Sequence, residues 1–159
     1  MARKGQSKPR NVEPDVIHGS RLVAKITNRS MRDGKKSVAA REVYEALELI
    51  KEKAGEDPVK VLERAMENIK PTMEVRPRRI GGAAYQVPQQ VRGIRRESLG
   101  IRWLIAAANS KSNSEFHTYA EKLASEIMDA AKGEGVSVKK RQDVERVAEA
   151  NKAFAHFRW

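Results

Sequence analysis

Apolar residues recur every three or four positions along most of this chain, which is the period of amphipathic helices. Caps and breakers divide the first half into three such segments. The first predicted helix covers residues 20–31. The second is predicted to run from a cap at Ser37 to a stop at Gly55, and the third from a cap at Asp57 to a stop at Pro71.

Three further helices are predicted in the second half. Residues 99–108 (LGIRWLIAAA) are apolar nearly all round, interrupted by Arg102, and are predicted to form the central buried helix. After a polar loop over 110–114, the next helix has an apolar stripe of Phe116, Ala120, Leu123, Ile127 and Ala131. The last helix is predicted to begin near Ser137 and to end before residues 153–159.

A β-hairpin is predicted between the third and fourth helices. Two glycines at 81–82 tolerate positive φ and lie between two extended arms, which is typical of a two-residue hairpin turn. This turn sets Arg78 opposite Tyr85 and Arg76 opposite Val87, so one face is basic and aromatic. Two strands alone are marginally stable in water, so the hairpin needs another element to pack against.

These elements predict a mainly α fold, a bundle of about six helices with one protruding two-stranded β-hairpin. At 159 residues, the chain can form one domain with a hydrophobic core. The predicted organisation is a basic, flexible N-terminal arm over 1–12, a single helical domain over 13–152 with the hairpin inserted at about 72–90, and an aromatic and basic C-terminal tail over 153–159.

The charge balance indicates a polyanionic partner. Lys and Arg number 32 against 21 Asp and Glu, which leaves a net charge of +11 and a pI near 10.1, and residues 1–36 and 71–103 hold most of the excess. The absence of cysteine excludes disulfides and thiolate chemistry and favours a reducing compartment. No apolar run approaches the ~20 residues of a membrane span, and residues 1–11 lack the apolar core of a signal peptide, so no membrane association is expected.

One stretch, residues 75–96, contains six arginines but neither lysine nor acidic residues. These arginines are Arg76, Arg78, Arg79, Arg92, Arg95 and Arg96. A guanidinium is always charged and presents paired donors that match phosphate oxygens, so this bias favours phosphate recognition. The alternative is a surface hairpin whose arginines only face solvent.

Basic residues also occur at or just inside three predicted helix starts, as Lys35-Lys36, Arg95-Arg96 and Lys139-Lys140-Arg141. The partial positive charge of a helix N-terminus disfavours cations there, whereas free amide donors beside basic side chains can hold a phosphate. The repetition indicates a bound polyanion. At any single site, the alternative is a long side chain that reaches away from the helix dipole.

The N-terminal arm is basic and almost without apolar residues. It carries Arg3, Lys4, Lys8 and Arg10. Such a segment is predicted to be disordered alone and to become ordered on nucleic acid. The alternative is a frayed terminus with no role.

No pattern of residues indicates catalysis. The three histidines lack paired metal-ligand spacing, no nucleotide-binding or nucleophile motif is present, and Glu42, Glu45 and Glu48 are predicted on an exposed helix face. We therefore expect no enzymatic activity, metal, cofactor or small-molecule substrate. A helical DNA-binding regulator is the alternative function, although no helix pair shows the short turn and polar recognition face that it needs.

Four motifs carry a family resemblance. They are residues 31–36 (MRDGKK), 73–82 (MEVRPRRIGG) with 85–88 (YQVP), 98–104 (SLGIRWL) and 144–159 (VERVAEANKAFAHFRW). In their order and spacing they closely resemble bacterial-type small-subunit ribosomal protein seven, a universal ribosomal protein family. The resemblance extends from about residue 13 to residue 159.

The resemblance implies a cytoplasmic constituent of the small ribosomal subunit. Such a protein would bind the 3′ major domain of ribosomal RNA, nucleate assembly of the subunit head, line the exit-site tRNA and mRNA region, and contact neighbouring ribosomal proteins of the head and platform. Besides the N-terminal arm, the implied RNA contacts are Arg32, Lys35, Lys36, Arg76, Arg78, Arg79, Arg92, Arg95, Arg96 and Arg102. The implied hairpin tip near tRNA and mRNA is Ile80, Gly81, Gly82, Ala83, Ala84 and Tyr85.

Overall fold

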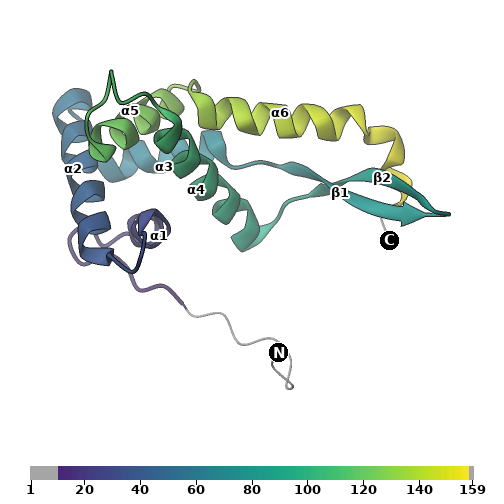
Figure 1. The fold of residues 1–159 in the computed structure, drawn as a ribbon, viewed down its shortest axis with the longest axis horizontal. Helices are drawn as coiled ribbons and strands as arrows, with labels where there is room; N and C mark the ends of the chain where they lie inside the picture. Colours follow the sequence, from purple (N-terminus) through teal and green to yellow (C-terminus); the bar gives the residue numbers. More distant parts are fainter. Residues whose placement is uncertain (1–10, 158–159) are drawn as a thin grey trace.

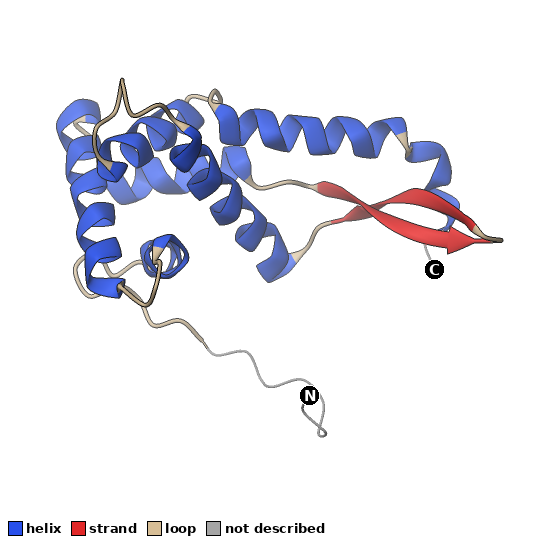
Figure 2. Ribbon diagram, viewed as in Figure 1, coloured by secondary structure: helices blue, strands red, loops and turns tan. Residues whose placement is uncertain are grey.

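A computed structural model describes residues 11–157 of the chain. Helices dominate this part, with one antiparallel hairpin between the third and fourth helices (Figure 2), which confirms the predicted fold class. The elements are α1 (Arg21–Ser30), α2 (Lys36–Ala54), α3 (Pro58–Ile69), β1 (Met73–Ile80), β2 (Ala83–Gln90), α4 (Gly93–Ser110), α5 (Tyr119–Ala131), α6 (Val136–Ala150) and the 3-10 helix η1 (Lys152–Phe157).

The hydrophobic core lies between α2, α3, α4 and α5, and α1 packs against α2 and α4. Residues 99–108, predicted as a buried helix, form the middle of α4, where Leu104 is fully buried and Arg102 is exposed. α5 is buried as thoroughly, because it packs against α2, α3 and α4 through residues such as Leu123 and Ile127. The apolar stripes therefore meet in one core.

Caps define two of the helix starts. The Asp57 carboxylate accepts a hydrogen bond from the Val59 amide at 3.0 Å, which confirms the predicted cap of α3. Thr118 and Glu121 form a reciprocal capping box at the start of α5. Phe116 therefore lies before this helix rather than on its stripe, and it is half-buried in the loop.

The predicted cap of α2 is wrong. Lys35 occupies the cap position, and Ser37 lies inside the helix. The preceding turn is tight, because Asp33 and Gly34 adopt φ values of +52° and +75° and the Lys35 amide donates to the Arg32 carbonyl at 2.9 Å. Because of this turn, α2 begins at Lys36, before the predicted cap at Ser37.

The hairpin has the predicted turn and register. Gly81 and Gly82 have φ values of +57° and +89°. Positive φ at both central residues is what a two-residue hairpin turn requires when its twist matches that of the strands. Arg78 lies opposite Tyr85 in the ladder, and Arg76 lies opposite Val87. The strands extend away from the helical body (Figure 1).

The hairpin packs against the C-terminal part of the chain. α6 runs beside the two strands (Figure 1) and contacts both, while η1 contacts β2. Val87 is fully buried in this packing. At the strand entrance, the amide and hydroxyl of Thr72 donate to the Glu145 carboxylate at 2.9 and 2.6 Å. α6 and η1 thus supply the support that a two-stranded sheet needs.

Candidate nucleic-acid interface

A buried carboxylate joins the hairpin base to the start of α4. Glu74 of β1 is 8% exposed and accepts hydrogen bonds from Arg95 of α4 at 2.7 to 3.0 Å. The Arg76 side chain donates to the same carboxylate at 2.9 Å. The bond from Arg95 is the main reason that the pKa of Glu74 is lowered. Two arginines share one carboxylate, so the trio keeps a net positive charge.

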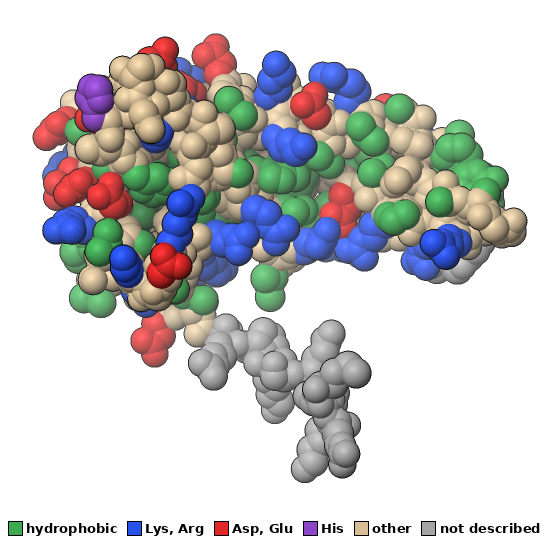
Figure 3. All heavy atoms as spheres, viewed as in Figure 1, with side chains coloured by type: hydrophobic (Ala, Val, Ile, Leu, Met, Phe, Trp, Pro, Cys, Tyr) green, Lys and Arg blue, Asp and Glu red, His purple; other side chains and the backbone are tan. Residues whose placement is uncertain are grey.

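The arginines between residues 76 and 102 form a band, which we call the arginine band. Figure 3 shows Lys and Arg side chains gathered along the lower edge of the molecule, from the helical body towards the hairpin. Five of the seven arginines between residues 76 and 102 are exposed, namely Arg76, Arg79, Arg92, Arg95 and Arg102. Exposed guanidinium groups on fixed strands and a helix suit phosphate contacts.

The remaining two arginines of the stretch are half-buried, so the structure does not present all of them equally. Arg78 lies in the strand pair opposite Tyr85. Arg96 is close enough to Glu67 and Glu145 to interact electrostatically with both carboxylates. Its Nε atom is buried without a hydrogen-bond partner. Arg96 is therefore packed more closely against the helices than Arg92, which is exposed.

A second basic group lies at the turn between α1 and α2. Arg32, Lys35 and Lys36 are all exposed there. α2 has no acidic residue in its first turn and no side-chain cap, and the same is true of α4. The prediction that Lys35-Lys36 and Arg95-Arg96 lie at or just inside helix starts is therefore confirmed.

The prediction of a phosphate seat at the start of α6 is wrong. Lys139 is the fourth residue of this helix, so the basic group Lys139-Lys140-Arg141 begins beyond its first three positions. Glu126, 0% exposed, already accepts hydrogen bonds from the Ser137 amide and hydroxyl at 2.9 and 2.6 Å. A buried carboxylate thus occupies the place where a phosphate was expected. RNA contact by the Lys139 group remains a prediction.

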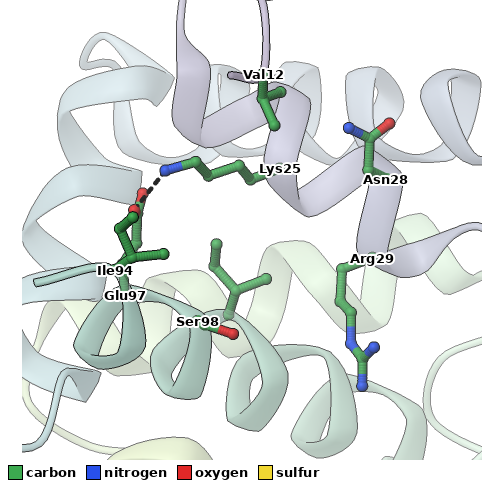
Figure 4. Close-up of a pocket in the computed structure, with 8 residues that line it drawn as sticks. Val12, Lys25, Asn28, Arg29, Ile94, Glu97 and Ser98 are labelled. Carbon is green, nitrogen blue, oxygen red and sulfur yellow. Dashed lines mark hydrogen bonds and ion pairs between the residues drawn. The ribbon is translucent and has the colours of Figure 1, made fainter. Parts of the chain in front are cut away.

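Lys25 and Arg29 of α1 are candidate contacts that the sequence analysis missed. They lie four residues apart on one helix face and, with Ile94, line a cleft between α1 and α4 (Figure 4). The four-residue spacing was the available signal. The sequence analysis used α1 only for its apolar stripe, which packs into the core, and therefore did not consider the spacing of its basic residues.

The hairpin tip combines small exposed residues with one packed aromatic ring. Residues 81–84 are exposed, whereas Tyr85 packs against Phe154 and Phe157 with ring centroids 5.2 and 5.3 Å apart. The tail therefore covers the ring of Tyr85. Arg3, Lys4, Lys8 and Arg10 lie outside the described residues.

One of the three glutamates predicted on an exposed face is not free in solvent. Glu42 is half-buried and accepts a hydrogen bond from the Ala120 amide at 3.2 Å, so it stabilises the start of α5. Within residues 11–157, no cluster of His, Cys, Asp and Glu could hold a metal ion. None of the described helices combines the length and apolarity needed to span a bilayer.

Comparison with known proteins decides the family. The family model described as ribosomal protein S7p/S5e matches residues 2–152. The chain belongs to the ribosomal protein S7p/S5e family. Small ribosomal subunit protein uS7 of Carboxydothermus hydrogenoformans is 54% identical to it, that of Streptococcus agalactiae 53% and that of Thermus thermophilus 51%, each over all 159 residues of both chains.

Membership in the S7p/S5e family confirms several expectations. The protein is a structural, RNA-binding constituent of the small ribosomal subunit that serves translation, and it is not an enzyme. The alternative of a helical DNA-binding regulator loses its support. The arginine band and the turn between α1 and α2 become candidate RNA contacts of a ribosomal protein.

Proposed function

We propose that this protein binds the 3′ major domain of small-subunit ribosomal RNA directly and nucleates assembly of the subunit head. The observation that carries the proposal is the arginine band, in which Glu74 holds Arg76 and Arg95 together across two elements. A band that spans a hairpin base and a helix start matches the bent surface of folded RNA better than a single groove of a straight duplex. Family membership supports the same class of partner.

Affinity and specificity have different sources in this proposal. Arginine and lysine contacts to phosphates supply most of the affinity, whereas duplex RNA offers little readable sequence to side chains. Specificity comes from the fixed spacing between the band and the basic turn of Arg32, Lys35 and Lys36. An RNA junction that brings phosphates to both places at once is bound tightly.

The hairpin tip has a separate role in the proposal, next to the exit-site tRNA and the mRNA. Gly81, Gly82, Ala83 and Ala84 have no long side chains, so the backbone there can approach another backbone closely. Neighbouring ribosomal proteins of the head and platform are the proposed protein partners. Exposed apolar side chains such as Val16, 97% exposed, are available for such contacts.

The proposal is tested by binding to a 3′ major domain RNA fragment and to an unrelated structured RNA of equal length, across a salt series. We expect strong preference for the ribosomal fragment at physiological salt. Contact with about 8 phosphates gives a log-log salt slope between roughly −5 and −7. Equal affinity for both RNAs, or a slope shallower than about −2, contradicts the proposal.

A further inference from the structure

A cleft of about 300 Å³ lies between α1 and the first turns of α4. Figure 4 shows Lys25, Asn28 and Arg29 on the α1 side and Ile94 and Glu97 on the α4 side. The surface that lines the cleft is mainly apolar, and polar side chains such as Asn28 and Ser98 also line it. A mainly apolar lining with a few polar groups is typical of pockets that bind small, partly apolar groups.

Ile94 is the unusual residue of this cleft. It is 75% exposed and lies between Arg92 and Arg95 in the sequence of the arginine band. Phosphates that bind the two arginines gain nothing from an isoleucine between them, because a charged backbone does not bury apolar surface. The face of a nucleotide base does bury such surface, and an unpaired RNA base can leave its stack to do so.

The rim offers hydrogen-bonding groups that suit the edge of a base. Asn28 has both donors and an acceptor, and Ser98 has a hydroxyl that can act either way. Glu97 pairs with Lys25 at 2.5 Å, so its negative charge is compensated. The guanidinium of Arg29 presents paired donors that suit a phosphate next to the base.

Charge decides between two occupants of the cleft. The chain's own N-terminal arm begins nearby, since Val12 lines the cleft, but the arm carries four basic residues and no acid over residues 1–12. The cleft is bordered by Arg29 and by the arginine band, which repel a basic arm. A nucleotide brings a negative phosphate on each side of its base, so RNA is the complementary occupant.

We propose that the cleft between α1 and α4 takes a single unpaired base of the bound RNA. The base face lies against Ile94, its edge meets Asn28 and Ser98, and its flanking phosphates bind Arg92 and Arg29. This inference rests on the proposed RNA-binding function and adds to it a recognition element for one unpaired nucleotide.

The first test compares the variant Ile94→Ser with the wild-type protein in binding to the 3′ major domain fragment. Ile94 is exposed, so the fold is retained. We expect affinity to fall by about 5-fold to 10-fold with an unchanged salt slope, since no phosphate contact is removed. The matched control is Val136→Ser, a 53% exposed apolar residue at the start of α6, which leaves affinity unchanged.

Two outcomes separate this inference from the proposed function. If the wild-type protein prefers the ribosomal fragment and Ile94→Ser binds it equally well, the base site is wrong and the proposed function stands. If the wild-type protein shows no preference for the ribosomal fragment, the proposed function itself fails.

The second test identifies the occupant with a benzophenone amino acid in place of Ile94, irradiated in the complex with the same RNA fragment. We expect one dominant cross-link, mapped by reverse transcription to a nucleotide that is unpaired in the RNA. Cross-links spread along a duplex, cross-links to residues 1–10 of the chain, or no cross-link to RNA would overturn the inference.

Discussion

Arg95 donates hydrogen bonds to both carboxylate oxygens of Glu74 at 2.7 to 3.0 Å across 21 residues of sequence. This contact joins β1 to α4, so it ties the base of the hairpin to the helical bundle. In the proposed RNA complex, this contact would also order Arg95 and Arg76 before RNA arrives, which lowers the entropy lost on binding. The proposed function therefore gives Glu74 a part in both stability and recognition.

The variant Glu74→Gln is expected to lower the free energy of unfolding by about 1 kcal/mol, because it weakens hydrogen bonds to charged donors that are half exposed. Urea denaturation followed by circular dichroism measures the change. The control Glu56→Gln removes a carboxylate from an exposed pair with Arg64 and is expected to cost less than about 0.5 kcal/mol. Equal effects in the two variants would show that the burial of Glu74 has no energetic consequence.

The same pair predicts a pH dependence. The pKa of Glu74 is lowered in the folded protein, chiefly by Arg95, so the carboxylate contributes stability above its unfolded value of about 4.3. This contribution is lost as the pH falls through the folded-state pKa. We expect the stability difference between the wild-type protein and Glu74→Gln to be constant above about pH 5.5 and to shrink towards zero as the pH falls below the unfolded pKa and through the lowered folded-state pKa. A difference that persists unchanged at the lowest pH would contradict this explanation.

Glu126 is predicted to be a main determinant of the position of α6. Its carboxylate binds the Ser137 amide and hydroxyl and lies 3.3 Å from the Lys111 ammonium group. Replacement by alanine leaves the Ser137 amide and hydroxyl buried without their acceptor, whereas Lys111 keeps its pair with Asp129 at 2.9 Å, so Glu126→Ala is expected to cost about 2 to 4 kcal/mol. Thermal unfolding measures the loss. The control Glu149→Ala, on the exposed side of α6, should change stability by less than about 0.5 kcal/mol.

The aromatic cluster of Tyr85, Phe154 and Phe157 is predicted to hold β2 against the C-terminal segment. The variant Phe154→Ala removes one ring contact worth about 1 kcal/mol and some buried area. Hydrogen exchange of the β2 amides should therefore become about 5-fold to 10-fold faster, while exchange in α5 stays unchanged. Unchanged exchange in β2 would show that α6 alone supports the hairpin. The control Val147→Ala removes an exposed apolar side chain from α6.

Loss of a phosphate contact changes the salt dependence of RNA binding, whereas loss of a base contact does not. Arg102 is exposed on α4, and Arg102→Ala is expected to weaken RNA binding and to make the salt slope shallower by about 1. Lys60→Ala removes an exposed lysine of α3, outside both basic groups, and is expected to leave slope and affinity unchanged. Filter binding at several salt concentrations compares the two. An equal loss in both variants would indicate an effect of net charge alone.

The sequence by itself determined the features that depend on near neighbours. The number and order of the main helices follow from apolar spacing, the start of α3 from Asp57, and the hairpin register from Gly81-Gly82, because each depends on residues a few positions apart. The excess of basic residues and their concentration in two segments likewise needed no coordinates. The motifs identified the family, which the comparisons confirm.

Only the tertiary structure decided which groups meet across long separations. The start of α6 was taken by Glu126 of another helix. The Glu74–Arg95 pair, the packing of Tyr85 on the tail and the cleft beside Ile94 have no local signal either. The physical reason is that periodicity specifies which face of an element is buried, whereas the partner of each polar side chain depends on how the elements pack.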